Sequence, residues 1–343
     1  MDTDRIDFVM PWVDGSDPAW QAVKRRYEAE GENASPGDVD ANADCRWRDY
    51  GLLRYWFRAV ERFAPWVGRV FFVTCGQKPD WLDESNPKLR LVNHADYIPE
   101  EWLPTFQART IELNLHRIED LSERFVFFND DMFLLRDTKP GTFFRRGLPV
   151  IPCDLAVPRW IGYSNSSRTA LNNAGILKHS MDVDAQIRMN LWKFVNVRAL
   201  GFLRAAKNLA SFLVNRVYIP GTFGHLPMPH LKSTLAEIWR RQPNVMERTS
   251  KYRFRTNDSV NQWLVSAWDM VSGRFCPTNE KRLGRCLTLD ERNLEDLCDA
   301  VRRQKWQLIC LNDKGTTKDP ARCFAEAAKA FEAILPDRSS FEK

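Results

Sequence analysis

Two adjacent carboxylates interrupt an apolar run in the segment FVFFNDDMFLLRD, which covers residues 125–137. Asp130 and Asp131 follow residues that read as a buried strand, and apolar residues resume directly after them. Crowded carboxylates repel one another unless a cation compensates their charge, and Mg²⁺ binds through one or two carboxylates together with substrate phosphates. We therefore predict that Asp130 and Asp131 hold a divalent cation, Mg²⁺ or Mn²⁺. The alternative is a solvated turn in which Asn129 or Asp130 caps the next segment.

Polar residues also follow two other predicted strands. WVDGSD supplies Asp14 and Asp17 after the first strand, and TCGQ supplies Gly76 and Gln77 after the second. In open α/β sheets, ligands bind outside the carboxyl ends of the strands. If the strands are parallel, these side chains share one rim of the sheet with the two carboxylates of NDD.

Histidine and arginine side chains gather in two other segments. TFQARTIELNLHRI reads as a helix with Arg109, Glu112 and His116 on one face. Arginine binds phosphate through two parallel hydrogen bonds, and histidine exchanges protons near neutral pH. The loop GHLPMPH adds His225 and His230. These groups suit phosphate chemistry, although a surface cluster of salt bridges is the alternative for the helix.

The segment KYRFRTNDSVNQW places cations directly before a predicted helix. Arg253 and Arg255 stand two residues apart, and Asn257 or Asp258 is placed to cap the helix that follows. The N-terminus of a helix attracts anions through its free N–H groups. The segment is therefore a candidate anion site, with a simple helix cap as the alternative reading of Asp258.

The elements that must position these residues alternate along the first part of the chain. Predicted strands are runs of apolar residues, which is typical of parallel strands buried on both faces. They cover residues 6–13, 69–74, 88–93 and 124–129, with helices at 48–63 and 105–118. The pattern predicts an α/β fold with a mostly parallel, Rossmann-like or GT-A-like sheet, helices on both faces and a largely helical C-terminal part.

The rest of the chain reads as loops and helices. Predicted loops or irregular segments cover 22–45, 140–175 and 217–230. Predicted helices cover 183–216, 231–248, 258–272, 289–304 and 319–334, with a strand at 306–313. We expect three parts: an α/β part at 1–140, an irregular and helical insertion at 141–230, and a helical part at 231–343.

One helical stretch, residues 197–216, is basic and amphipathic, VRALGFLRAAKNLASFLVNR. Such a helix can lie on a membrane surface, so peripheral contact with the inner face of the cell membrane is one reading. A helix packed on its own domain is the other, and the pattern alone favours the packed helix.

Composition excludes several classes of protein. The chain has 343 residues and a formal net charge of +5, too small an excess to indicate nucleic-acid binding in the absence of a recognisable module. Its eight cysteines include no CxxC pair, so we expect reduced thiols and no structural zinc. The acidic N-terminus is unlike a signal peptide, and no apolar run reaches the length of a membrane span. We expect a cytoplasmic protein.

Four segments, in this order, resemble the conserved blocks of the Stealth family of sugar-phosphate transferases. The blocks begin with IDFVMPWVDGSDPAW at 6–20 and continue from RWRDYGLLRYW to NDDMFL across 46–134. The third runs from HLPMPHLK to FRTNDSVNQW, 225–263, and the short fourth is CLND, 310–313. The resemblance implies a bacterial enzyme of capsule or cell-wall polysaccharide synthesis that transfers a sugar-1-phosphate from a nucleotide-diphosphate sugar to an acceptor hydroxyl.

The resemblance implies that 1–140 binds the nucleotide sugar and that 231–343 completes the active site. It also implies roles for residues. Asp130 and Asp131 would bind Mg²⁺ and the diphosphate, and the arginines at 48, 109 and 255 would neutralise phosphate oxygens. The general base would be His116, His230 or Asp258, with no ranking among them. Residues expected to bind the nucleotide sugar are Asp14, Gly15, Asp17, Arg48, Asp49, Gly76, Gln77 and Asn257.

Two other functions stay open at this point. A metal-dependent glycosyltransferase would use the same carboxylates but would attack the anomeric carbon and release a nucleoside diphosphate. A non-catalytic polysaccharide-binding protein would show no turnover. The donor is a UDP-hexose, UDP-GlcNAc or another nucleotide sugar, and the acceptor is a polysaccharide or other glycan.

Overall fold

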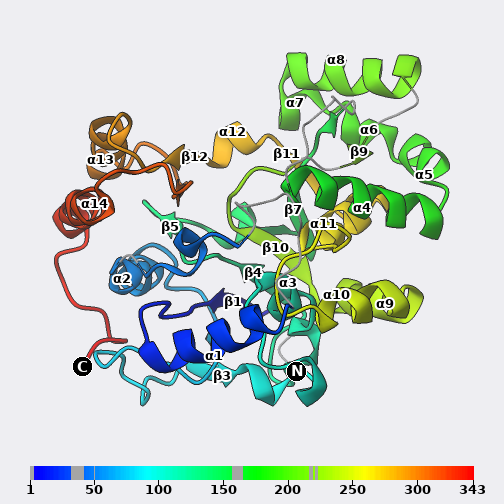
Figure 1. The fold of residues 1–343 in the computed structure, drawn as a ribbon. Helices are drawn as coiled ribbons and strands as arrows, with labels where there is room; N and C mark the ends of the chain where they lie inside the picture. Colours follow the sequence, from blue (N-terminus) through cyan, green and yellow to red (C-terminus); the bar gives the residue numbers. More distant parts are fainter. Residues whose placement is uncertain (1–3, 32–41, 50, 157–164, 216–218, 221–222) are drawn as a thin grey trace.

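A five-stranded sheet forms the centre of the molecule (Figure 1). The computed structural model describes residues 4–31, 42–49, 51–156, 165–215, 219–220 and 223–343. The strands lie in the order β10–β4–β1–β2–β3, with bounds β1 Ile6–Pro11, β2 Val70–Thr74, β3 Leu89–Asn93, β4 Arg124–Phe127 and β10 Met228–Leu231. The first four strands are parallel, and β10 is antiparallel to β4. The carboxyl ends of β1, β2 and β4 therefore meet at one edge.

Apolar side chains cover both faces of this sheet, because alternate residues of a strand point to opposite faces. Phe8 of β1 belongs to one buried cluster and its neighbour Val9 to another. The first cluster includes Trp56 of helix α2, Leu53–Phe63, and the second includes residues of helix α11, Trp263–Val271. The predicted fold class, a mostly parallel α/β sheet between helices, is confirmed.

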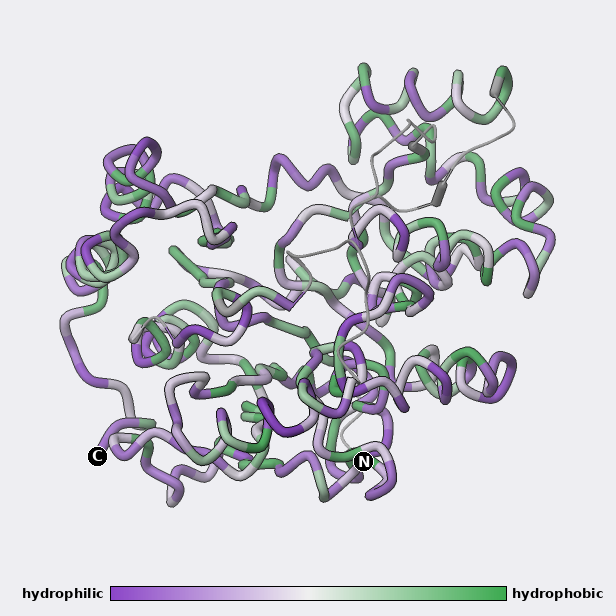
Figure 2. Tube along the Cα trace, in the orientation of Figure 1, coloured by the Kyte–Doolittle hydropathy of each residue, from purple (hydrophilic) through white to green (hydrophobic). Residues whose placement is uncertain are grey.

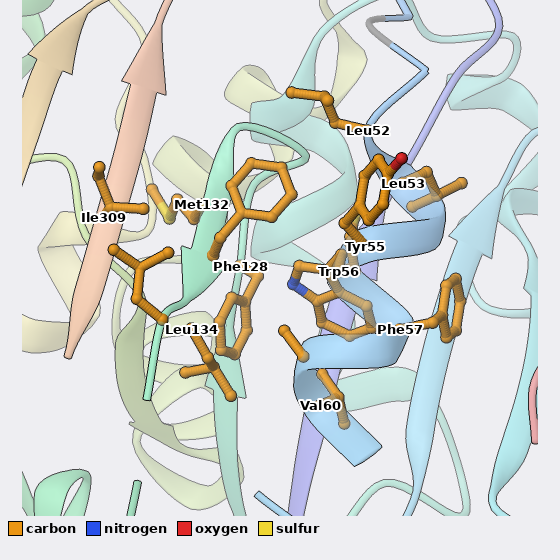
Figure 3. Close-up of a cluster of buried hydrophobic side chains, with 14 of the residues drawn as sticks. Leu52, Leu53, Tyr55, Trp56, Phe57, Val60, Phe128, Met132, Leu134 and Ile309 are labelled. Carbon is orange, nitrogen blue, oxygen red and sulfur yellow. The ribbon is translucent and has the colours of Figure 1, made fainter. Parts of the chain in front are cut away.

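A second, three-stranded sheet lies beside the first. It has the order β12–β13–β5, with bounds β5 Met132–Leu134, β12 Gly284–Thr288 and β13 Leu308–Asn312. The chain leaves the main sheet at the end of β4 and enters the small sheet at β5, so the NDD residues form the link between the two. Figure 3 shows Phe128, Met132 and Leu134 of this crossing packed between Trp56 and Ile309 of β13. The apolar residues on both sides of NDD therefore fix the position of the two carboxylates.

Short helices and strands make up the remainder. The other helices are α1 Pro18–Ala29, α3 Ala108–Leu113, α4 Asn165–Ser180, α5 Val183–Met189, α6 Leu191–Phe194, α7 Val197–Leu200, α8 Phe202–Ala210, α9 Lys232–Arg241, α10 Pro243–Lys251, α12 Glu280–Leu283, α13 Leu294–Arg302 and α14 Pro320–Ile334. The other strands are β6 Phe144–Arg145, β7 Leu148–Pro152, β8 Leu155–Ala156, β9 Ile219–Pro220 and β11 Cys276–Thr278. None of the helices in the described ranges combines the length and apolar character needed to cross a bilayer.

Several element boundaries differ from those expected. The helix expected at 105–118 consists of α3 and a separate 3₁₀ turn at Leu115–Arg117. The segment 140–175 is not irregular, since it contains β7 and the first turns of α4, although 157–164 lie outside the described residues. The loop expected at 22–45 begins only after α1 ends, and its residues 32–41 are likewise outside the described ranges.

The loop expected at 217–230 ends in β10, a strand of the main sheet. Pro229 made this segment read as a loop, but proline is tolerated in a strand at the edge of a sheet, and β10 is an edge strand. The boundary expected at residue 230 falls inside β10. We therefore propose that the third part of the chain begins before Met228.

Candidate active site

A cavity of about 1010 Å³ opens at the carboxyl ends of β1 and β4. Its walls come from segments far apart in the sequence, including the NDD link, α3, the loop before β10 and the end of β13. The charged, histidine and amide side chains of its lining are Arg46, Arg48, His94, Gln107, Arg109, Glu112, Asn129, Asp130, Asp131, Asn165, His225, Arg255, Asn261, Gln262, Asn312, Asp313 and Lys314. Pockets for drug-sized ligands measure roughly 300–1,000 Å³, so this cavity accepts a ligand at least that large.

Asp131 is a carboxylate of the cavity that contacts side chains of two distant segments. Its Oδ2 lies 3.3 Å from His225 Nε2 and accepts a hydrogen bond from Cys310 Sγ at 3.3 Å. Burial raises the pKa of the Cys310 thiol well above its ordinary value, so the thiol stays protonated and acts as a donor. The other oxygen, Oδ1, is buried and has no hydrogen-bond partner among the described residues. One oxygen of Asp131 is thus held in place, and the other is available to a ligand.

Asp130 is the neighbour of Asp131 in the chain, and its surroundings disfavour the charged form of its carboxyl group. Burial, followed by the neighbouring charges of Asp131 and Asp49, raises the pKa of Asp130 to about 8. A cation bound between the two carboxylates would remove this penalty. With an unpartnered carboxylate oxygen at Asp131, this pair of hard oxygen donors fits a divalent ion such as Mg²⁺. Potential metal-ligand atoms of Asp131, His225 and Cys310 also lie within 4.8 Å of one another, but the contacts of the last two with Oδ2 already account for their positions.

His225 is the histidine that the fold brings to the two carboxylates. Its Nε2 contacts both Asp131 and, at 3.2 Å, Asn129 Nδ2. Burial opposes protonation of the imidazole, but the charge of Asp131 and its hydrogen bond outweigh that effect and raise the pKa of His225. A carboxylate that orients an imidazole in this way is the arrangement of a general base and its positioning group.

Arginine side chains contribute positive charge to the lining of the cavity. Arg255 is half-buried, and burial together with the nearby Arg46 and Arg109 lowers its pKa to about 10. It remains protonated at neutral pH, so the three guanidinium groups form a cationic wall that an anion would stabilise. Arg109 is held by Thr256 O at 2.8 Å and by side chains of α4.

Arg48 forms a separate ion pair at the end of the small sheet. Its Nη1 lies 2.8 Å from Oδ2 of Asp313, whose side chain is fully buried. Because Asp313 follows β13 directly, this pair joins the segment before α2 to the small sheet. Arg48, which was predicted to bind the nucleotide sugar, lies in the lining of the cavity.

The polar residues after β1 and β2 form a structural cluster instead of lining the cavity. Gln77 bridges the backbone N and O of Asp14 and donates to Asp17 Oδ2 at 2.9 Å. The Asp14 carboxylate accepts hydrogen bonds from Ser16, and Asp17 caps α1. The shared rim expected for all four carboxylates is therefore only partly formed, because local hydrogen bonds orient Asp14 and Asp17 toward their own loop.

The presence of glycine at two positions of this cluster is explained by two different structural constraints. A Cβ on Gly15 would lie 1.9 Å from Trp47 O, so only glycine allows this close approach. Gly76 has a φ of +98°, which favours glycine at the turn after β2. Trp47 lines the cavity, so Gly15 shapes its wall from behind.

The expected general bases lie away from the cavity lining. His116 packs against Trp239, with ring centroids 5.7 Å apart, and burial lowers its pKa to about 4. His230 is buried in β10 with Nε2 2.6 Å from Gln262 Oε1. Asp258 is exposed and accepts a hydrogen bond from Tyr252. We leave all three out of the proposed site.

Two expected binding residues have other contacts. Asn257 Oδ1 accepts a hydrogen bond from Asn165 Nδ2 at 3.1 Å, so Asn257 supports a residue of the lining. Asp49 is exposed, with Oδ1 accepting from Gly51 N at 3.2 Å and from Trp12 Nε1 at 3.5 Å, and its charge contributes to the raised pKa of Asp130.

Sequence reasoning did not assign roles to several residues that the fold brings together. His225 was visible in GHLPMPH, but nothing in the sequence showed that β10 would carry it to the NDD link. Cys310 and Asp313 belong to CLND, and their role depends on β13 pairing with β5. Asn165 and Gln262 carried no signal, because each acts by holding a neighbour.

Comparisons with known proteins identify families and relatives that this chain resembles. The Stealth protein conserved region 1 matches residues 4–32, and conserved region 2 matches residues 46–150. The receptor polysaccharide phosphotransferase WefC of Streptococcus oralis is 38% identical over 98% of this chain and 99% of its own length. The capsular polysaccharide phosphotransferase WcwK of Streptococcus pneumoniae is 37% identical over 98% and 99%. The exopolysaccharide phosphotransferase cps2G of Lactiplantibacillus plantarum is 33% identical over 98% and 96%.

Among solved structures, the galactosyltransferase LgtC in complex with donor and acceptor sugar analogues is similar over 97% of this chain and 96% of its own. The sequence identity is 13% and the TM-score is 0.40. The two matched Stealth regions correspond to the first two of the four blocks recognised in the sequence.

Proposed function

The chain belongs to the Stealth family of polysaccharide phosphotransferases, and from that premise we propose that it transfers a sugar-1-phosphate to a hydroxyl of a growing polysaccharide. The donor is a nucleotide-diphosphate sugar, a UDP-hexose or UDP-GlcNAc. The acceptor oxygen attacks the phosphorus next to the sugar, the bond to the bridging oxygen breaks, and a nucleoside monophosphate leaves. The product is a phosphodiester within a capsular polysaccharide or exopolysaccharide.

One observation supports this proposal: Asp130, Asp131 and His225 line the same cavity as Arg46, Arg109 and Arg255. Phosphoryl transfer is mostly positioning and charge stabilisation. The arginines match the negative charge of a diphosphate, and two carboxylates in the same cavity would need a cation to coexist with that diphosphate.

Asp130 and Asp131 would hold Mg²⁺ or Mn²⁺, with Oδ1 of Asp131 as one ligand atom. When bound, the ion would neutralise diphosphate oxygens and so favour departure of the nucleoside monophosphate. Asp131 has a second task through Oδ2, which orients His225.

His225 would take the proton of the acceptor hydroxyl. With Nε2–H donated to Asp131, Nδ1 would accept the proton, and the Asp131 carboxylate would stabilise the imidazolium that forms. Arg255 and Arg109 would hold the phosphate oxygens as charge moves to the leaving group. Arg48, fixed by Asp313, would contact the donor from the other side.

The nucleotide that is released separates the candidate functions. Purified protein is incubated with a panel of UDP-sugars, a glycan acceptor and Mg²⁺ or Mn²⁺, and the nucleotide product is identified by chromatography. UMP supports the phosphotransferase, and UDP would establish the glycosyltransferase instead. Ligand binding without turnover in the presence of either metal ion would leave a non-catalytic binding protein as the remaining candidate. The proposed compartment is the cytoplasm.

A further inference from the structure

Helix α8 has its apolar face on the outside. The helix covers Phe202–Ala210 and continues as π-helical turns at Ser211–Asn215. The exposed fractions are 72% for Phe202, 83% for Leu203, 60% for Leu213 and 78% for Val214. Spacings of one, ten and one residues between them fit one face of a helix with 3.6 residues per turn. A surface helix of a globular protein normally turns this face toward the core.

The inner face of α8 is small and polar. Its buried residues are Ala205, Asn208 and Ser211, each three positions after the last. Asn208 donates to Phe194 O at 2.9 Å and accepts from Leu155 N at 3.0 Å. These bonds satisfy buried backbone groups and attach the helix firmly to the molecule. The exposed apolar face is therefore a fixed feature of the fold.

Two cations reinforce the attachment of α8. Arg204 lies 3.0 Å and Lys207 2.9 Å from the carboxylate of Asp154. Of the two readings offered by the sequence, the structure shows the helix packed on its own domain. The helix packs on its own domain through polar residues, and it presents an apolar surface to the outside.

The surroundings of α8 are basic. Residues 185–214 contain no Asp or Glu and five basic residues, of which Lys193 is buried. The other four are Arg188, Arg198, Arg204 and Lys207, and they outnumber Asp154, the carboxylate that pairs with the last two. Trp192 in this stretch is 63% exposed. In Figures 1 and 2, α8 lies with α7 at one extremity of the molecule, away from the main sheet. Exposed Phe and Leu with nearby Lys and Arg are the composition of a helix that lies in a membrane interface.

We propose that the outer face of α8 binds an anionic lipid surface, with Phe202, Leu203, Leu213 and Val214 inserted at the headgroup boundary. The fourteen residues of the helical stretch span roughly 21 Å, less than the roughly 30 Å hydrocarbon core, so α8 lies along the surface. A symmetric pair of chains would bring the same basic stretch against itself, whereas anionic lipids neutralise it. This proposal is independent of the reaction at the cavity.

The test is flotation of the full chain with vesicles of phosphatidylcholine, alone or mixed with phosphatidylglycerol, at low and high salt. Wild-type protein floats with the mixed vesicles at low salt and less at high salt, because salt screens the basic stretch. The double variant Phe202→Ser/Leu203→Ser binds at least about tenfold more weakly. The control Val23→Ser, an exposed apolar residue of α1, binds like wild type.

Circular dichroism and thermal unfolding of the double variant check that it folds. Because both side chains are exposed, its melting temperature should equal that of wild type. The proposal is overturned if wild-type protein does not float with anionic vesicles, or if the folded double variant floats equally well. A wild-type dimer that the double variant converts to a monomer, without vesicle binding by either, would also overturn it and assign the face to a second copy.

Discussion

The imidazole Nε2 of His225 lies 3.3 Å from the Oδ2 of Asp131, and the other oxygen of that carboxylate is buried without a partner in the described part of the chain. The pairing depends on the antiparallel addition of β10 to β4, because β4 leads into the NDD link and the loop before β10 carries His225. This one contact joins a group able to accept a proton to a group able to hold a cation.

We predict that Asp131→Asn reduces kcat by about 100-fold or more, because the variant would weaken binding of the cation that stabilises the phosphoryl charge. The matched control is Asp14→Asn, whose carboxylate is occupied by Ser16 outside the cavity lining. Its kcat should change by less than about tenfold. The steady-state rate of nucleoside monophosphate release measures kcat for both variants. Equal losses in two folded variants would restore Asp14 to the metal site.

Replacing the proposed base should separate His225 from the histidine that the sequence suggested. We expect His225→Asn to lower kcat by roughly 10²–10⁴-fold with little change in melting temperature. His116→Asn, buried against Trp239, should keep kcat and lose stability instead. If His116→Asn abolished turnover in a folded protein while His225→Asn did not, the assignment of the base would be wrong.

The close approach of Gly15 to Trp47 predicts a loss of stability for Gly15→Ala. A Cβ at 1.9 Å from Trp47 O forces the backbone to move, at a cost of about 1–3 kcal/mol. Gly175→Ala is the control with opposite sign, since that Cβ meets open space within α4 and alanine favours a helix by roughly 0.5–1 kcal/mol. Thermal unfolding compares the two. Unchanged stability of Gly15→Ala would show that the contact is looser than described.

Buried histidines predict that acid destabilises the protein. Burial lowers the pKa of His230 from 6.5 to about 4 in the native state, whereas the unfolded chain has the ordinary value. Between these two values the unfolded state binds more protons, so the free energy of unfolding falls as pH decreases from about 6.5 to 4. Denaturant titrations should give His230→Asn a smaller slope in this window, by at most about 1.4 kcal/mol per pH unit. An unchanged slope would contradict the neutral state of His230.

Sequence could predict the parts of the site that depend on local patterns. The apolar strands and the NDD motif are local, so the parallel sheet and the position of Asp130 and Asp131 at its edge followed from them. The directions in which the side chains point could not be predicted from local patterns. Asp14 and Asp17 stand after the right strand, but Gln77 and the cap of α1 hold their carboxylates.

Residues that reach the site through long-range pairing were harder to predict. His225 and His230 looked equivalent in the sequence, yet the strand direction of β10 buries one and leaves the other at the cavity. Cys310 and Asp313 depend on β13 joining β5, a pairing with no local signal. The apolar face of α8 was visible as periodicity, but its outward direction follows from Asn208 and Asp154.

The fate of the donor's β-phosphorus tests the central claim most directly. A UDP-sugar labelled with ³²P at the phosphate next to the sugar is incubated with the enzyme, a glycan acceptor and Mg²⁺, and the polymer is separated from nucleotides. Transfer of sugar-1-phosphate predicts label in the polymer and unlabelled UMP in solution. Label that remains in the released nucleotide, with sugar alone in the polymer, would contradict the account.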